Sequence, residues 1–188
     1  MTVETIISIC LGIGLAASVG FRVFLPLFAL SLASYFDVWH LNASWQWIGS
    51  TTALITLGVA TVVEIFAYFI PYIDNLLDSV SVPLAALAGT VVMLSTVSDL
   101  SPVITWALAI IAGGGTAAVI SGTSATTRLA STAKTGGLAN PLVSTLETGT
   151  ALIMTVISIF LPILAIVLVV MLFFIIYKVY KKFKPTKA

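Results

Sequence analysis

The segment TIISICLGIGLAASVGFRVFLPLFALSLASYF (residues 5–36) contains one charged side chain, that of Arg22, in an otherwise apolar run. A transmembrane helix needs only about 20 mostly apolar residues, so this segment is too long for one straight span. The residues that interrupt it are Gly12, Gly14, Gly20, Arg22 and Pro26. We expect a broken or re-entrant span here; the alternative is a helix that packs closely on its neighbours through small residues.

The composition of the whole chain excludes a water-soluble domain. Of the 188 residues, 60% are hydrophobic and 8% are charged, whereas soluble proteins are about 45–50% apolar and about 25% charged. The one cysteine, Cys10, can form no internal disulfide and no cysteine-rich metal site. We therefore predict an all-α polytopic membrane protein, with a single transmembrane domain over residues 1–184 and the end of a cytoplasmic tail at 185–188.

Apolar runs of suitable length predict about six transmembrane helices. They cover residues 5–36, 49–71, 82–97, 103–120, 141–161 and 163–180. The third is short and is expected to begin inside the acidic segment 72–81, and a tight turn near Pro162 separates the last two. Three tryptophans in residues 37–47 are typical of an interfacial belt. The polar stretch 121–140 is expected to connect the fourth and fifth spans.

Basic residues predict one orientation of these spans. The tail over residues 178–187 carries five lysines and no acidic residue, and such clusters lie on the cytoplasmic side of a membrane. With six spans, both termini are then cytoplasmic, and so are Arg128 and Lys134. The tryptophan-rich link and Asp99 fall on the outside, where no Lys or Arg occurs.

Similar elements recur in the same order along the chain, which predicts an internal repeat. Residues 12–17 resemble residues 113–118 in their Gly/Ala pattern. The spacing from Gly58 to Pro71 also equals the spacing from Gly149 to Pro162.

Each half of the chain, about 1–100 and 101–184, would hold three spans. An odd number turns the second half upside down, which gives the inverted repeats found in many secondary transporters. The glycine-rich segments 12–26 and 113–128 then occupy corresponding positions in the two halves. Both segments are therefore candidates for broken or re-entrant pieces that surround a substrate site.

Two arginines are the main candidates for binding an anionic group. Arg22 lies within an apolar span, where an unpaired charge costs several kcal/mol, so it either has a function or pairs with Glu64. Arg128 follows a run of Ser and Thr residues, a chemistry that suits a carboxylate or phosphate, although a solvated loop is the simpler explanation. The expected substrate-binding residues are Arg22, Arg128, Gly20, Ser121, Thr123 and Ser124.

Carboxylates suggest two further roles. Glu64 lies well inside the second span, and a buried carboxylate can exchange protons near neutral pH, so Glu64 is a candidate for proton coupling. Its alternative is a permanent partner for an arginine. Asp74 and Asp78 lie four residues apart and could hold a cation through oxygen atoms, although such a pair is more often a solvated helix face. Glu147, nearer to a span end, receives no role.

Other kinds of chemistry find no support in the sequence. HExxH, CxxC, P-loop and GxSxG motifs do not occur, so we expect no catalytic residues, no metal, no cofactor and no enzyme activity. The lysine-rich tail is the one basic cluster, and it suits anionic lipid better than nucleic acid. We therefore expect no nucleic-acid partner.

The segment GIGLAASVGFRVFLP (residues 12–26) resembles the opening signature of a bacterial membrane family, the domain of unknown function 4126 family. The span with Glu64 that reaches PYIDNLLD (residues 71–78) is also similar, as is the Gly/Ser/Thr-rich segment that ends near Arg128. The resemblance implies a small polytopic protein of the bacterial inner membrane. It implies no activity, because the family has none assigned.

These features favour a secondary transporter or translocase for an anionic solute or lipid headgroup that carries a carboxylate or phosphate, coupled to protons through Glu64. Two other classes stay open. One is an oligomeric ion channel in which the arginines select anions, and the other is a structural or assembly protein without transport. The expected partners are membrane lipids and the anionic small molecule or headgroup, with a homo-oligomer left open.

Overall fold

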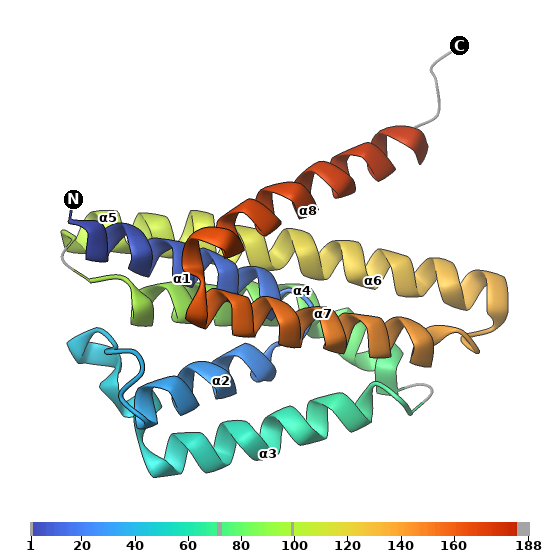
Figure 1. The fold of residues 1–188 in the computed structure, drawn as a ribbon. Helices are drawn as coiled ribbons and strands as arrows, with labels where there is room; N and C mark the ends of the chain where they lie inside the picture. The colour runs from blue at the N-terminus through green and yellow to red at the C-terminus, as the bar shows by residue number, and fades with distance from the viewer. Residues whose placement is uncertain (1, 71–72, 99, 184–188) are drawn as a thin grey trace.

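A computed structural model describes residues 2–70, 73–98 and 100–183 of the chain, and all regular structure in these ranges is helical. Figure 1 shows the helices side by side as one bundle. Their bounds are α1 Val3–Val19, α2 Phe24–Tyr35, the 3₁₀ helix η1 Ala43–Gly49, α3 Thr51–Ala67, α4 Ile73–Thr96, α5 Pro102–Leu108, the π-helical segment η2 Ala109–Gly114, α6 Gly115–Thr135, α7 Asn140–Phe160 and α8 Pro162–Phe183.

Several of the helices have the length and apolar composition of membrane spans, whereas α1 and α2 are apolar but shorter. Four of them, α4, the continuous α5–η2–α6, α7 and α8, are long and apolar enough to cross a bilayer, and η1 with α3 forms a bent fifth candidate. Large apolar side chains such as Leu87, Leu146 and Phe174 are exposed on the outside of the bundle. Because so much apolar surface is costly in water, the bundle is that of a multi-pass membrane protein.

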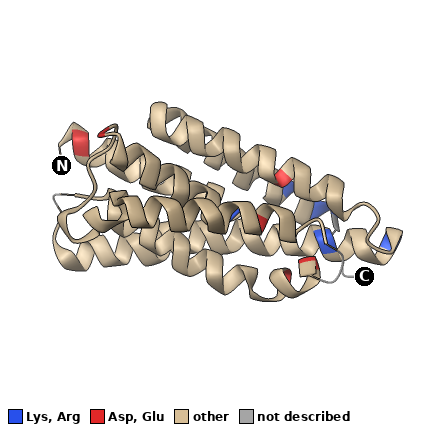
Figure 2. Cartoon of the chain, turned by 90° about the horizontal axis from the view of Figure 1, so that it is seen from below, with Lys and Arg blue, Asp and Glu red and all other residues tan. Residues whose placement is uncertain are grey.

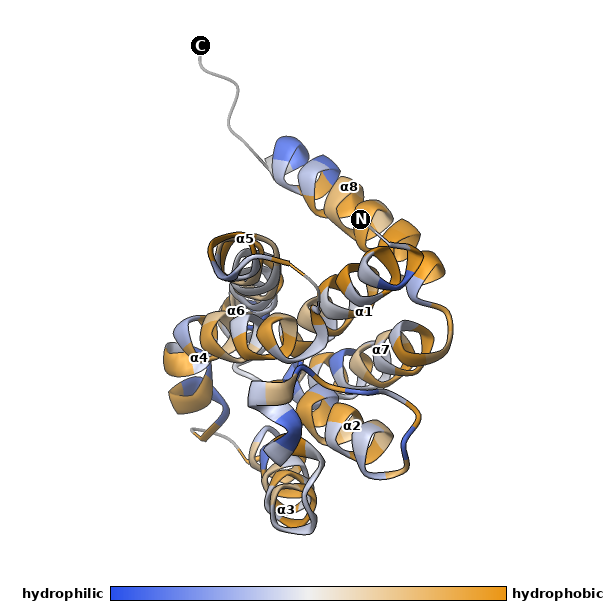
Figure 3. Ribbon diagram, turned by 90° about the vertical axis from the view of Figure 1, so that its left-hand side faces the viewer, coloured by the Kyte–Doolittle hydropathy of each residue, from blue (hydrophilic) through white to orange (hydrophobic). Residues whose placement is uncertain are grey.

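Helix α1 lies at the centre of this bundle. It packs against α4, α6, α7 and α8, which surround it in Figure 3. Its side chains Leu11, Leu15 and Val19 are almost completely buried in the main apolar core. The position of α1 matters for function, because its C-terminal end carries Arg22 into the interior.

The first glycine-rich segment is broken, as expected, at residues 20–23. Helix α1 ends at Val19, and α2 begins at Phe24 and runs back toward the end of the bundle where the chain started (Figure 1). Pro26 fits in the first turn of α2, where its missing N–H leaves no helical hydrogen bond unmade. Gly12 and Gly14 lie inside the continuous helix α1, where they contact neighbouring helices.

The second glycine-rich segment, 113–128, is not broken, so this part of the prediction is wrong. The chain runs as one helix through α5, η2 and α6. Gly113 faces Gly89 on α4, and a Cβ atom on either glycine would meet backbone atoms of the other. These glycines therefore permit two helices to approach closely, as small residues do in membrane proteins.

The polar stretch 121–140 also differs from the expected loop, because α6 continues to Thr135. Hydroxyl groups within it bond to the helix itself: Thr123 donates to the carbonyl of Val119, and Thr127 to that of Thr123. Internal bonding of this kind lets a polar sequence stay helical near apolar surroundings. Gly136, in the left-handed conformation at φ 62°, ends the helix.

Two expected helix ends are confirmed. Helix α4 begins at Ile73, inside the acidic segment, and the break between α7 and α8 falls immediately before Pro162. Figure 1 shows α8 leaving the break at an angle to α7. Pro71, Asp99 and the tail lysines Lys184 and Lys187 lie outside the described residues.

The start of α1 and the end of α8 lie at opposite ends of the bundle (Figure 1), whereas the sequence predicted both on one side. The reason is the reversal at residues 20–23. Because α2 returns to the starting end, α3 begins there, and α3, α4, α6, α7 and α8 then alternate in direction. One extra change of direction moves the C-terminal end to the other side.

Candidate functional site

Arg22 is buried and fully engaged, with 1% of its surface exposed. Its Nε donates to Thr148 Oγ1 at 2.9 Å, and its Nη2 donates to both the carbonyl and the hydroxyl of Ser144, at 3.0 and 2.6 Å. Its Nη1 donates to the carbonyl of Phe21 and lies 3.4 Å from Glu147 Oε2. The guanidinium of Arg22, three residues after the end of α1, is thus held on one face of α7.

Arg128 meets the same carboxylate from α6. Its Nη2 donates to Glu147 Oε2, and its Nε lies 3.7 Å from Asp78 Oδ1 on α4. Ser124, one helical turn earlier, donates to the other oxygen of Glu147. Arg128 is also 1% exposed, so it is a buried helix residue and not the loop residue that the sequence suggested.

A tyrosine lies beside both guanidinium groups. The ring centroid of Tyr68 is 4.2 Å from the Cζ atom of Arg22 and 4.2 Å from that of Arg128. At this distance an aromatic ring attracts a cation, more strongly where water is excluded. Tyr68, at the end of α3, therefore helps to hold the two positive charges in one place.

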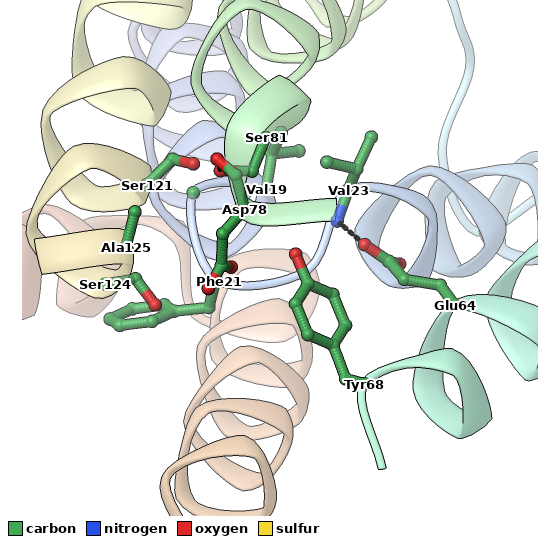
Figure 4. A pocket seen from close by; sticks show the side chains of 11 residues that line it. Val19, Phe21, Val23, Glu64, Tyr68, Asp78, Ser81, Ser121, Ser124 and Ala125 are labelled. Carbon is green, nitrogen blue, oxygen red and sulfur yellow. Dashed lines mark hydrogen bonds between the residues drawn. The ribbon is translucent and has the colours of Figure 1, made fainter. Parts of the chain in front are cut away.

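Glu64 has a different role from the ion pair with Arg22 that the sequence suggested. Its Oε1 accepts a hydrogen bond from the Val23 backbone N–H at 2.7 Å (Figure 4). Its Oε2 accepts one from the Phe24 backbone N–H at 2.9 Å. These donors belong to the start of α2, where backbone N–H groups lack helical partners and the helix dipole favours negative charge. Glu64 on α3 thus caps α2 and fixes the reversal that carries Arg22.

The structure gives Asp74 and Asp78 different partners. Asp78 faces Arg128, whereas Asp74 accepts a hydrogen bond from the Asn140 side chain at 2.9 Å. Each carboxylate thus has its own partner, that of Asp74 on α7 and that of Asp78 on α6, and a shared cation stays a prediction. Within the described ranges, no group of three or more His, Cys, Asp or Glu side chains could hold a metal ion.

The remaining expected site residues fall on two surfaces of α6. Ser121 and Ser124, with Gly20, Glu64, Tyr68 and Asp78, line a small cavity with room for about one water molecule. Figure 4 shows these side chains around the cavity, with the Tyr68 hydroxyl turned toward its centre. Thr123 lies apart from this cavity and lines a groove on the outside of α6.

The cluster lies near one end of the bundle. Glu64 is three residues before the end of α3, and Glu147 is seven residues after the start of α7. Arg128 is seven residues before the end of α6. At 1.5 Å per residue, these positions are about 5–10 Å from the helix ends. The cluster therefore lies in the half of the bundle that contains the α6–α7 turn.

The residues of α7 at the centre of the cluster were not among the expected site residues. Ser144, Glu147 and Thr148 share one face of α7, because residues three and four apart are neighbours on a helix. A polar stripe on an otherwise apolar helix was the signal that could have identified them. Tyr68 carried no comparable signal, because one tyrosine at the end of a span is ordinary.

This arrangement brings two positive charges to one oxygen atom, Glu147 Oε2, in a region without bulk solvent. Buried charges persist only when they are paired and hydrogen-bonded, and here Glu147 and Asp78 supply the negative charge. A group that offers oxygen atoms in a plane or a tetrahedron, such as a carboxylate or phosphate, has the geometry that paired guanidinium groups bind. Glu147 itself occupies this position.

The fold and the cluster together define a multi-pass helical membrane protein with a buried arginine–carboxylate centre. The chain belongs to the DUF4126 family, described as a domain of unknown function, whose family model matches residues 9–182. No curated protein and no solved structure matches the chain.

Proposed function

We propose that the protein is a secondary transporter or translocase for a molecule that carries a carboxylate or phosphate. One observation carries this proposal: two buried arginines converge on a single carboxylate oxygen, that of Glu147. The side chain of Glu147 then holds the place of the substrate's anionic group. When Glu147 is neutralised by a proton, the donors of Arg22 and Arg128 become available to the substrate.

Glu64 supplies the coupling in this proposal. Its charge caps the start of α2, and the capped reversal at residues 20–23 positions Arg22. Protonation of Glu64 would remove the negative charge from the helix start and weaken both hydrogen bonds. The segment with Arg22 could then move between two positions, which alternating access requires.

The proposed location is the bacterial inner membrane, with the C-terminal end in the cytoplasm. Lys134 and the lysines Lys178, Lys181 and Lys182 lie in the last turns of α6 and α8, at one end of the bundle. The blue segments near C in Figure 2 mark this end, whereas red segments without blue ones appear near N. The positive-inside rule then places the N-terminus outside, because α1 and α2 form a returning pair.

The inverted repeat predicted from the sequence stays a prediction. One difference between the halves counts against it: the chain reverses at residues 20–23 in the first half, whereas α5, η2 and α6 continue without a break at the corresponding position of the second. A search for a half-turn superposition of residues 1–100 on 101–184 tests it directly.

A structural or assembly protein is the second candidate, and the saturation of Arg22 favours it. Every nitrogen of this guanidinium has a hydrogen-bond partner within the protein. A permanently closed network of this kind would hold α1, α6 and α7 together without binding anything else.

Flux measurements on the reconstituted full-length chain separate the two candidates. Proteoliposomes loaded with labelled inorganic phosphate or succinate, or carrying a fluorescent phosphatidic acid, should show saturable movement of at least one probe that responds to a pH gradient. Glu147→Gln should change the pH response, whereas Glu4→Gln, an exposed acid on α1, should not. Movement of none of the probes, with folded protein in the vesicles, would favour the structural candidate.

A further inference from the structure

A groove of about 280 Å³ runs along the outside of the bundle between α6, α7 and α8. Its floor includes Ser124 and Glu147, which belong to the arginine–carboxylate cluster. Its walls include the apolar side chains of Leu146, Leu172 and Ile176. The groove therefore joins the buried cluster to the flank of the protein.

This groove opens sideways, toward the region that acyl chains occupy in a membrane. The Leu146 side chain on its rim is 72% exposed, and the outer face of α8 carries exposed Met171, Phe174 and Ile175. Figure 1 shows α8 diverging from α6 and α7 along this flank. A water-soluble ion would meet apolar walls on this route, whereas an acyl chain would find them favourable.

Charge complementarity on α8 indicates the kind of lipid. Lys178, Lys181 and Lys182 follow the groove residue Ile176 within the next two helical turns. Lysines in this position attract anionic lipid headgroups, and they stand at the membrane surface nearest to the groove.

A further observation indicates where a headgroup would bind. Arg128 is 1% exposed, and its Nη1 has no hydrogen-bond partner within the described part of the chain. A buried guanidinium nitrogen without a partner is costly. A phosphate oxygen at the floor of the groove, beside Ser124, would supply an acceptor with the charge and shape that arginine binds.

We infer that the groove between α6, α7 and α8 admits an anionic membrane phospholipid from the leaflet on the lysine side. With Glu147 neutralised by a proton, the headgroup phosphate lies at the floor formed by Ser124 and Glu147, whose partner Arg128 lies behind them, and an acyl chain lies between α7 and α8. This inference rests on the proposed function, because it names the substrate class of that same arginine–carboxylate site.

Photolabelling of the full-length protein in nanodiscs tests the inference. One probe is a phosphatidic acid with a diazirine in its acyl chain, and the other is a phosphatidylcholine with the same chain. The phosphatidic acid should label α7 and α8 peptides that line the groove several-fold more than the phosphatidylcholine. Equal labelling by the two probes would overturn the inference.

Paired tryptophan variants locate the labelled site. Ile176→Trp fills the groove and should reduce labelling several-fold, whereas Ile175→Trp, at an outward-facing and 55% exposed position, should leave it unchanged. Leu146→Trp narrows the groove from an exposed rim position, so it tests the same point with little risk to folding. Unchanged labelling in both groove variants, checked for folding by size exclusion, would overturn the inference.

Two more readouts separate failure of the inference from failure of the proposed function. Flux of inorganic phosphate without groove labelling would leave the transporter proposal standing and overturn lateral access by lipid. Groove labelling without exchange of fluorescent phosphatidic acid between leaflets would support the lipid site and overturn transport. Inorganic phosphate and unlabelled phosphatidic acid can each be added as a competitor of labelling. If inorganic phosphate protects the groove as effectively as phosphatidic acid does, the lipid assignment is also overturned.

Discussion

At the scale of single residues, the protein is organised around one carboxylate. Glu147, on α7, accepts hydrogen bonds from Arg22 in the link between α1 and α2, and from Ser124 and Arg128 on α6. Each arginine is buried, so each depends on this shared partner for its stability. The consequence is that three helices are coupled through a single side chain.

Replacement of Arg22 by Ala should destabilise the protein strongly. It leaves Glu147 with one arginine and removes the hydrogen bonds that Arg22 donates to Ser144 and Thr148. Loss of one partner from a buried pair costs about 3–5 kcal/mol. Unfolding in detergent micelles measures the change. Arg22→Lys keeps the charge without the planar set of donors and should fall between wild type and Arg22→Ala. Wild-type stability of Arg22→Ala would contradict a buried network.

Replacement of Glu64 by Gln should remove one source of pH dependence from transport while the chain stays folded. The Gln side chain keeps one oxygen acceptor for the start of α2, so the cost should resemble the loss of a helix cap, about 0.5–2 kcal/mol. Flux at several pH values, normalised to folded protein, measures the effect. A pH profile identical to that of wild type would exclude Glu64 as the coupling residue.

At the scale of helices, close packing depends on glycine where α4 crosses η2. Gly89 and Gly113 face each other there, whereas Gly149 on α7 has open space around it. A glycine in a helix costs stability unless the absence of a side chain is needed. The two kinds of position therefore predict opposite outcomes for the same substitution.

Gly113→Ala should destabilise the fold, because the added methyl group meets the backbone of Gly89 and forces the helices apart, at about 1–3 kcal/mol. Gly149→Ala should stabilise the fold by up to about 1 kcal/mol, because alanine is the better helix former. Thermal unfolding of the two variants in the same detergent measures both. Equal effects of the two substitutions would show that close approach at Gly113 is not required.

At the scale of the whole molecule, the reversal at residues 20–23 decides on which side of the membrane the chain begins. We expect the N-terminus outside and the end of α8 inside. In a Cys10→Ala background, Thr2→Cys should react with a membrane-impermeant maleimide in intact cells. Lys181→Cys should react only after the membrane is opened. Protection of Thr2→Cys in intact cells would contradict this topology.

The class of protein and several helix ends could be predicted from the amino-acid sequence. A chain with few charges and long apolar runs requires a membrane. Its apolar side chains are favourable in lipid, and its helices satisfy their own backbone hydrogen bonds there. The acidic start of α4 and the break before Pro162 followed from local composition, since proline and charge act on the residues beside them. The burial of Arg22 was also predictable, because its neighbours along the chain are apolar.

The partners of these residues depend instead on how the helices pack in three dimensions. Arg22 contacts Glu147 across more than a hundred residues, and Glu64 caps a helix that belongs to another part of the chain. Such pairings depend on which helix faces pack together, and the hydrophobic pattern of one helix does not specify its neighbour's polar residues. The burial of Arg128 and the direction of α2 followed from the same packing, so the apolar runs determined the helices, and their contacts determined the site.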